Sequence, residues 1–428
     1  MFFLVFFGFY APKTHKVCPL ENCSIQHPVF TRIAKAVCEY LSDHRIPAYC
    51  ENDGSGLVRH IYLRIAQATG QIMLCLVLKE NKFTDEKNFV EKIVSQFPEI
   101  SSICINIQAE NTNVILGKQT YCIYGSEKIT DEFCGRNLKI SPLSFYQVNH
   151  DAAEILYKTA FEMANLDQFD HVIDLYCGIG SISLSTHSKC PITGVEIVPE
   201  AVEDAKCNAL LNGANNTNYI CGDASSAFKF IQELGAVNPL LIVDPPRKGL
   251  TKELIADISK HNIGSVLYIS CGPDTFARDL AIFRSFGYEI STVQPVDLFP
   301  RTSHIENIAI LHRKSACHSM KLASIPFQMI KEGKKTIELR LNDVKRKTVK
   351  IGDKILFKDC ISEETLSVEV TALHYFSSFE ELYQNLSLLK LGYTDENVLS
   401  ASPEDMRLYY TPEEEAKFGV AGIEFVKI

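Results

Sequence analysis

The stretch Val266–Arg278, which reads Val-Leu-Tyr-Ile-Ser-Cys-Gly-Pro-Asp-Thr-Phe-Ala-Arg, predicts how the centre of the chain folds. Its apolar and aromatic residues indicate a buried strand, the Gly-Pro pair ends that strand, and Asp274 is in position to cap a following helix. Cys271 therefore falls just past the carboxyl end of the strand, where open α/β sheets bind ligands. A helix amino terminus nearby would favour its thiolate, so Cys271 could act as a nucleophile. Taken alone, a cysteine at a strand end is more often a small buried hydrophobic residue.

The sequence on either side continues this alternation of strands and helices. Val172–Ser181 predicts a buried strand, a tight glycine turn and the start of a helix, a pattern that binds nucleotides when the next strand ends in an acid about 20 residues on. Ile192–Glu196 is such a strand, and Glu196 could accept hydrogen bonds from a ribose. Two further strands end at Asp223 and Asp244. The expected fold class is α/β, with a Rossmann-like, doubly wound sheet.

Two smaller domains are expected, one before and one after this sheet. The helices and strands of the first, an α+β unit over residues 1–130, are expected at residues 28–43, 58–64, 72–78, 85–97, 102–107 and 113–116. The composition turns polar from Arg313 onwards. The sheet domain is therefore expected over residues 131–314, and a separate tail domain over residues 320–428.

The composition indicates a globular protein of a reducing cytoplasm. With 428 residues, 46% of them hydrophobic, the chain is long enough for more than one domain. Its 15 cysteines are scattered without the spacing of a disulfide framework. A net charge of −9 argues against a protein that coats nucleic acid over its whole surface, although a local basic face remains compatible with it. The apolar run Met1–Phe9 is too short to span a membrane and lacks the basic residue of a signal peptide, so a core strand whose partners are missing and a soluble protein are expected.

Four motifs, in this order, resemble the RNA methyltransferases that use S-adenosylmethionine to methylate carbon 5 of uridine. They are Asp-Leu-Tyr-Cys-Gly-Ile-Gly (Asp174–Gly180), Asp-Pro-Pro-Arg-Lys-Gly (Asp244–Gly249), Ser-Cys-Gly-Pro (Ser270–Pro273) and His-Ile-Glu (His304–Glu306). Within this family, the motifs resemble those of the bacterial 23S ribosomal RNA (uracil-5-)-methyltransferases. The order and spacing of the motifs make the resemblance specific.

The resemblance implies a cofactor and a covalent mechanism. The residues that it places around S-adenosylmethionine are Gln147, Tyr176, Glu196, Asp223 and Asp244. It also implies that Cys271 is the catalytic nucleophile and Glu306 the general base. Carbon 5 of uracil is a poor nucleophile, so a thiolate first adds to carbon 6 and gives an enolate that can attack the methyl group. A base must then remove the proton from carbon 5 before the cysteine leaves.

Further residues could hold the substrate, because a uridine buried in RNA structure must be extruded before it is methylated. Phe145, Tyr146, Phe299 and Arg301 could stack on this base or hold it, or they could be ordinary core and surface residues. Asp244 could contact either the edge of the base or the cofactor, and the sequence does not decide between these two roles.

The chain departs from the family pattern in two places. Gly272 stands where the family more often has Asn. Members usually begin with an RNA-binding barrel, and many then carry three closely spaced cysteines that bind a 4Fe–4S cluster together with a fourth. Only Cys23 resembles one of these ligands, so the sequence starts inside the family pattern, either because the natural protein is shortened or because the sequence is incomplete. No intact cluster and no other metal site are expected, which iron and sulfide assays would test.

The tail resembles the ASCH domain, a small β-barrel-like fold associated with RNA. Gly333–Arg340, which reads Gly-Lys-Lys-Thr-Ile-Glu-Leu-Arg, matches its Gly-x-Lys-x-x-Glu-x-Arg signature. The resemblance implies an additional RNA contact, with Lys335 and Arg340 on phosphate or base. A structural lysine–glutamate pair is the alternative for these residues, and a second activity as a small amidohydrolase stays open.

The expected function is methylation of uridine carbon 5 in RNA, with 23S ribosomal RNA as the preferred substrate. A methyltransferase for transfer RNA uridine shares the same core motifs and is the first alternative. A non-catalytic RNA-binding relative is the second. RNA is the expected partner, with no membrane and no obligate protein partner, in the cytoplasm.

Overall fold

The computed structural model describes residues 3–225, 227–228, 231, 235–236, 238–261 and 263–428. They form two compact units. The first comprises Met1–Glu162, Asp174–Asp223 and Asp297–Ser303, and the second comprises Met163–Ile173, Ala224–Val296 and His304–Ile428. The predicted domain limits (1–130, 131–314 and 320–428) stay a prediction.

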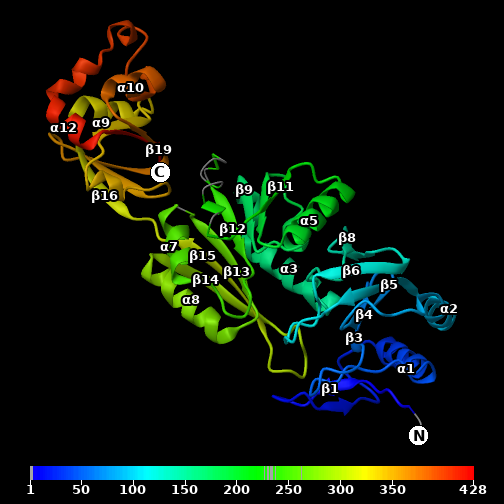
Figure 1. The fold of residues 1–428 in the computed structure, drawn as a ribbon. Helices are drawn as coiled ribbons and strands as arrows, with labels where there is room; N and C mark the ends of the chain where they lie inside the picture. The colour runs from blue at the N-terminus through cyan, green and yellow to red at the C-terminus, as the bar shows by residue number, and fades with distance from the viewer. Residues whose placement is uncertain (1–2, 226, 229–230, 232–234, 237, 262) are drawn as a thin grey trace. The chain divides into compact units, whose positions relative to one another are not determined.

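A four-stranded sheet forms the core of the α+β region near the amino terminus (Figure 1). Its strands, in spatial order, are β3 (Val58–Ile65), β4 (Ile72–Leu78), β5 (Ile100–Ile107) and β6 (Gln119–Gly125). Only β4 and β5 pair in parallel. Helices α1 (Pro28–Asp43) and α2 (Glu86–Gln96) bury apolar side chains against this sheet in one core. Both helices and three of the strands lie where the sequence predicts them.

The strand predicted at residues 113–116 is wrong. Side chains hold the backbone there: Asn106 Nδ2 donates to the carbonyl of Gly117 at 2.8 Å, and Gln108 Nε2 donates to that of Val114 at 2.9 Å. Gly117 approaches so closely that a Cβ atom on it would lie 1.8 Å from the carbonyl oxygen of Ile107. The fourth strand therefore begins only at Gln119.

The apolar run at the amino terminus does not form a single buried strand. Among its described residues, Leu4 is 77% exposed and only Val5 is buried. The chain forms a short antiparallel pair instead, β1 (Gly8–Tyr10) with β2 (Val17–Pro19). The strand β1 covers only the end of the run, and Val5 and Phe7 are the residues of the run that pack against the amino-terminal core.

The central sheet has seven strands, in the order β11-β10-β9-β12-β13-β15-β14. In chain order they are β9 (His171–Leu175), β10 (Ile192–Glu196), β11 (Thr217–Cys221), β12 (Pro239–Val243), β13 (Ser265–Ser270), β14 (Tyr288–Val296) and β15 (Glu306–Arg313). The associated helices are α3 (His150–Ala164), α4 (Ser181–Ser185), α5 (Pro199–Leu211), α7 (Lys252–Lys260) and α8 (Pro273–Ser285). This confirms the predicted α/β fold class.

The sheet is not parallel throughout, because β15 pairs antiparallel with both β13 and β14. Residues 297–305 are too few for the crossover helix that a parallel connection requires, so the chain returns beside β14 in the opposite direction. All residues of β12 and β13 are buried, as expected for strands covered on both faces.

The tail forms a curled half-barrel sheet, in the order β16-β18-β19-β20-β17 (yellow to red in Figure 1). Its strands are β16 (Cys317–Leu322), β17 (Ile337–Leu341), β18 (Lys354–Asp359), β19 (Thr365–Phe376) and β20 (Val420–Lys427). Its helices are α9 (Ser324–Lys331), α10 (Phe379–Asn385), α11 (Leu388–Leu391) and α12 (Pro412–Phe418). A separate small sheet, β7 (Ile129–Phe133) with β8 (Arg136–Ile140), precedes the central sheet in the chain.

All 15 cysteines are free thiols. Within the described part of the chain, no helix is both long and apolar enough to cross a membrane. No group of three or more His, Cys, Asp or Glu side chains among these residues is arranged to hold a metal ion.

Candidate active site

Cys271 lies between the end of β13 and the start of α8 and is half-buried. The prediction that Asp274 caps this helix is wrong, because Gly272 occupies the N-cap position and Asp274 lies in the first turn. A Cβ atom on Gly272 would lie 2.7 Å from Thr275 Oγ1. The Thr275 hydroxyl donates to the carbonyls of Gly272 and Arg247 at 3.0 and 3.1 Å. Glycine at this position therefore leaves room for the Thr275 side chain that links the cysteine loop to Arg247.

Glu306 is the first residue of β15, as its position in the motif predicts, and only 5% of it is exposed. Burial raises the pKa of Glu306 to about 7, against the opposing effect of the Arg247 guanidinium. A carboxyl that titrates near neutral pH can accept a proton and later release it, as a general base requires.

The expected stabilisation of the Cys271 thiolate is wrong. Burial raises the pKa of the Cys271 thiol, and the carboxylates of Glu306 and Asp244 raise it further. The Arg247 guanidinium opposes these effects without cancelling them. Arg247 is thus a residue that the sequence interpretation missed, although it lies within the quoted Asp-Pro-Pro-Arg motif. Its Nη2 atom lies 3.4 Å from His304 Nε2.

A second group of predicted site residues surrounds the glycine turn after β9. Tyr176 adopts a positive φ of 67°, and Gly178 follows at 54°. The Glu196 carboxylate accepts hydrogen bonds from the backbone N–H of Gly178 at 3.1 Å and of Val198 at 2.9 Å. Glu196 therefore shapes the turn, and its half-buried carboxylate keeps further acceptor positions for a ligand.

Asp174, in the same motif, is a residue to which the sequence interpretation gave no role. It is fully buried, and its Oδ2 atom accepts from the Ser183 backbone N–H at 3.1 Å. Its Oδ1 atom has no hydrogen-bond partner in the structure. Burial raises the pKa of Asp174 to about 7. A buried acceptor left open beside a glycine turn fits a ligand that brings donors, as the ribose hydroxyls and ammonium group of S-adenosylmethionine would.

The remaining cofactor candidates lie in different parts of the chain. Gln147 is half-buried in the irregular segment before α3, and Asp223 is exposed after β11. The first compact unit contains Gln147, Tyr176, Glu196 and Asp223, and the second contains Asp244, Cys271 and Glu306. The roles of these residues stay predictions.

The four candidates for contact with the extruded uridine differ in exposure. Phe145 is 72% exposed, Arg301 is exposed and Phe299 is half-buried. Tyr146 is only 9% exposed, and its hydroxyl donates to Asp131 Oδ2 at 3.0 Å. Of the two alternatives left open for Tyr146, the structure therefore favours an ordinary core residue, because interactions within the protein occupy both its ring and its hydroxyl.

In the tail, Lys335 and Glu338 form the structural lysine–glutamate pair that was the alternative to an RNA contact. Lys335 is 7% exposed, and its Nζ atom donates to the carbonyl of Leu391 at 2.6 Å and lies 3.4 Å from Glu338 Oε2. Arg340 Nη2 lies 3.0 Å from the other carboxylate oxygen of Glu338. An RNA contact by Lys335 would require this buried pair to open.

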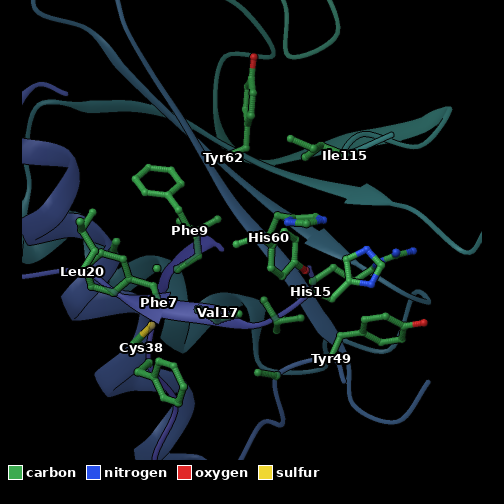
Figure 2. Close-up of a pocket in the computed structure, with 18 of the residues that line it drawn as sticks. Phe7, Phe9, His15, Val17, Leu20, Cys38, Tyr49, His60, Tyr62 and Ile115 are labelled. Carbon is green, nitrogen blue, oxygen red and sulfur yellow. The ribbon is translucent and has the colours of Figure 1, made fainter. Parts of the chain in front are cut away.

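A cavity of about 990 Å³ lies apart from these residues, lined by the amino-terminal segment, α1 and β3. Figure 2 shows His15, Tyr49 and His60 around it. Its described lining includes none of the predicted catalytic or cofactor residues. The cavity therefore takes no part in the assignment of the reaction.

The raised pKa of Glu306 makes folding stability depend on pH. Between its ordinary pKa of 4.5 and its folded pKa of about 7, the carboxyl is ionised in the unfolded chain and protonated in the folded one. Its contribution to stability therefore falls as pH rises through this window and is constant above it. Relative to Glu306→Gln, the wild type is expected to lose up to about 3 kcal/mol between pH 5 and pH 8. Urea unfolding at both pH values measures this, and an equal difference at the two would contradict it.

Comparison with known proteins gives two family matches. The model of the tRNA (uracil-5-)-methyltransferase family matches residues 69–314, and that of the ASCH domain matches residues 320–428. A Bacillus cereus protein named as an uncharacterized RNA methyltransferase is 41% identical over 310 residues, which cover 72% of this chain and 67% of the relative. One from Caldanaerobacter subterraneus is 39% identical over 307 residues, covering 72% and 68%.

A solved structure supports the fold. The tRNA (uracil-54, C5)-methyltransferase of Pyrococcus abyssi, in complex with S-adenosylhomocysteine, is similar to this chain with a TM-score of 0.60 and 24% sequence identity. The similarity covers 71% of each chain.

Proposed function

Because the chain belongs to the tRNA (uracil-5-)-methyltransferase family, and is thus an S-adenosylmethionine-dependent RNA methyltransferase, we propose that it methylates uridine carbon 5 of 23S ribosomal RNA through a covalent bond to Cys271. The observation that carries this proposal is the register of β13 and β15. Ser270 pairs with Asn307 in antiparallel strands, so Cys271 and Glu306 both lie one residue beyond this pair, at the same end of the two strands. Nucleophile and base then face the same substrate.

The proposed reaction has three steps. The Cys271 thiolate bonds to carbon 6 of uracil, and the electrons of the double bond move onto the carbonyl oxygen at carbon 4. S-adenosylmethionine, when bound, would supply an electrophilic methyl group. Carbon 5 takes up this methyl group as the enolate returns its electrons, the bond between methyl and sulfur breaks with its electron pair on sulfur, and S-adenosylhomocysteine is left. The Glu306 carboxylate then takes the proton from carbon 5, the double bond forms again, and the bond between Sγ and carbon 6 breaks.

Arg247 helps to explain how a thiol with a raised pKa becomes reactive. It is the cation that lowers the pKa values of both Cys271 and Glu306. Protonation removes the negative charge of Glu306, which otherwise disfavours the Cys271 thiolate. Addition of the thiolate to carbon 6 is therefore favoured by a neutral Glu306, and removal of the proton from carbon 5 requires an ionised one.

The cofactor is proposed to bind at the glycine turn. Gln147, Tyr176, Glu196, Asp223 and Asp244 are the residues proposed to surround it, with Glu196 on the ribose. The open Oδ1 atom of Asp174 supports a ligand with donor groups at this turn. Asp244 keeps two possible contacts, the cofactor or the base edge.

The substrate needs a direct test, because the matching family and the Pyrococcus abyssi neighbour are both named for transfer RNA. The purified chain is incubated with labelled S-adenosylmethionine and transcripts of 23S ribosomal RNA or transfer RNA, and 5-methyluridine is mapped by mass spectrometry. We expect label in the ribosomal RNA. Label in transfer RNA alone would replace this substrate, and label in neither would favour the non-catalytic RNA-binding alternative. RNA is the proposed partner, and the cytoplasm is the proposed location.

A further inference from the structure

The segment Ser141–Asn149, which carries Gln147, has no regular secondary structure, yet hydrogen bonds hold it on both sides of that residue. The Arg64 guanidinium donates to the carbonyl of Ser144. Asn149 Nδ2 donates to the carbonyl of Leu298 at 2.8 Å. Tyr146 and Gln147 lie between these two contacts.

Tyr146 provides a further attachment. Its hydroxyl donates to Asp131 Oδ2 at 3.0 Å, and its ring packs edge-on against Phe133 with 5.7 Å between ring centroids. Burial alternates along the segment: Tyr146 is buried, whereas Phe145 is 72% exposed and Gln147 is half-buried. Holding the Tyr146 side chain inward therefore constrains the backbone from which the next side chain, Gln147, projects.

Asp131 is a rigid acceptor for this hydrogen bond. It is fully buried on β7 and accepts from the backbone N–H groups of Gln67 at 3.0 Å and Ala68 at 2.8 Å. A buried carboxylate is stable only when donors compensate its lost hydration, and here the backbone supplies them. Burial and the Asp131 charge raise the pKa of Tyr146 above its usual range, so its hydroxyl stays protonated and remains a donor.

We propose that the hydrogen bond between Tyr146 and Asp131 positions Gln147 for S-adenosylmethionine. This inference rests on the proposed function, which places Gln147 at the cofactor. Tyr146 and Asp131 are positioning residues, because they act through the neighbouring side chain and not through contact with the ligand. Loss of the hydroxyl then weakens cofactor binding even when the ring stays in place.

The test is a double-mutant cycle in the full-length chain, with the Kd of S-adenosylhomocysteine measured by calorimetry. Gln147→Ala is expected to raise this Kd about tenfold, and Tyr146→Phe about fivefold. The double variant should bind no more weakly than Gln147→Ala alone, within about twofold, because both changes remove one interaction. Tyr121→Phe is the matched control: its hydroxyl donates to Asn81 Oδ1 at 2.7 Å on a different segment, and its Kd should equal that of the wild type.

Three results would overturn the inference. In the first, the double variant raises Kd by the product of the two single effects, which would mean that Tyr146 does not act through Gln147. In the second, Tyr146→Phe lowers the unfolding temperature and leaves Kd unchanged, which marks a purely structural role. In the third, Gln147→Ala binds like the wild type. Failure of the proposed function would look different, since a chain that methylates no uridine can still show coupling in this cycle.

Discussion

Replacing Cys271 by alanine is expected to abolish methyl transfer, with a loss of at least about 10⁴-fold in rate, because carbon 5 of uracil is unreactive until a nucleophile has added to carbon 6. The covalent step can be seen directly with RNA that contains 5-fluorouridine. Fluorine cannot be removed as a proton, so the wild type should stop after methyl transfer as a protein–RNA adduct that survives denaturation. Cys271→Ala should form no adduct, and gel mobility with mass spectrometry would identify the linked nucleotide.

The control for this experiment is Cys207→Ala, which removes an exposed thiol on α5. It should form the adduct as the wild type does. Cys271→Ala should still bind S-adenosylhomocysteine, which shows that it is folded. An adduct that persists in Cys271→Ala would assign the nucleophile to another residue. Absence of an adduct in the wild type, with cofactor and RNA both bound, would support a non-catalytic RNA-binding protein.

The positions of most site residues could be predicted from the sequence, because the signals are local. Apolar runs that end in Gly-Pro or Asp-Pro-Pro fix where a strand stops, so Cys271 and Asp244 both fall at strand ends as predicted. Glu306 is the first residue of β15, because the polar segment before it gives way to the apolar run of that strand. The spacing of these signals also predicts the order of the strands along the chain.

The electrostatics of the site could not be predicted, because they depend on residues far apart in the sequence. A helix amino terminus beside Cys271 suggests a lowered pKa, but burial and two carboxylates from other strand ends raise it. The inward orientation of Tyr146 likewise depends on Asp131, which no local pattern connects to it. The false strand at residues 113–116 has a different, short-range origin. The side chains of Asn106 and Gln108 bind the backbone carbonyls of Gly117 and Val114, which a pattern of apolar residues does not reveal.

Glu306→Gln is expected to separate methyl transfer from product release. The amide keeps the shape of the side chain but cannot take the proton from carbon 5, so the methylated uridine should stay bound to Cys271 even in ordinary RNA. Turnover should fall by about 10²- to 10⁴-fold, the usual contribution of a general base, while a single round of methyl transfer persists. Denaturing gels of RNA carrying a labelled methyl group would show this adduct.

The pH dependence gives this prediction a second readout. Only ionised Glu306 can act as the base, and its pKa lies at about 7, so the rate of release by the wild type should rise between pH 6 and pH 8 and then level off. Release by Glu306→Gln should show no such rise. Glu289→Gln, a substitution at an exposed position on β14, is the matched control and should follow the wild type. If Glu306→Gln releases its product as fast as the wild type does, the proton from carbon 5 leaves by another route. Glu306 would then have a structural role only.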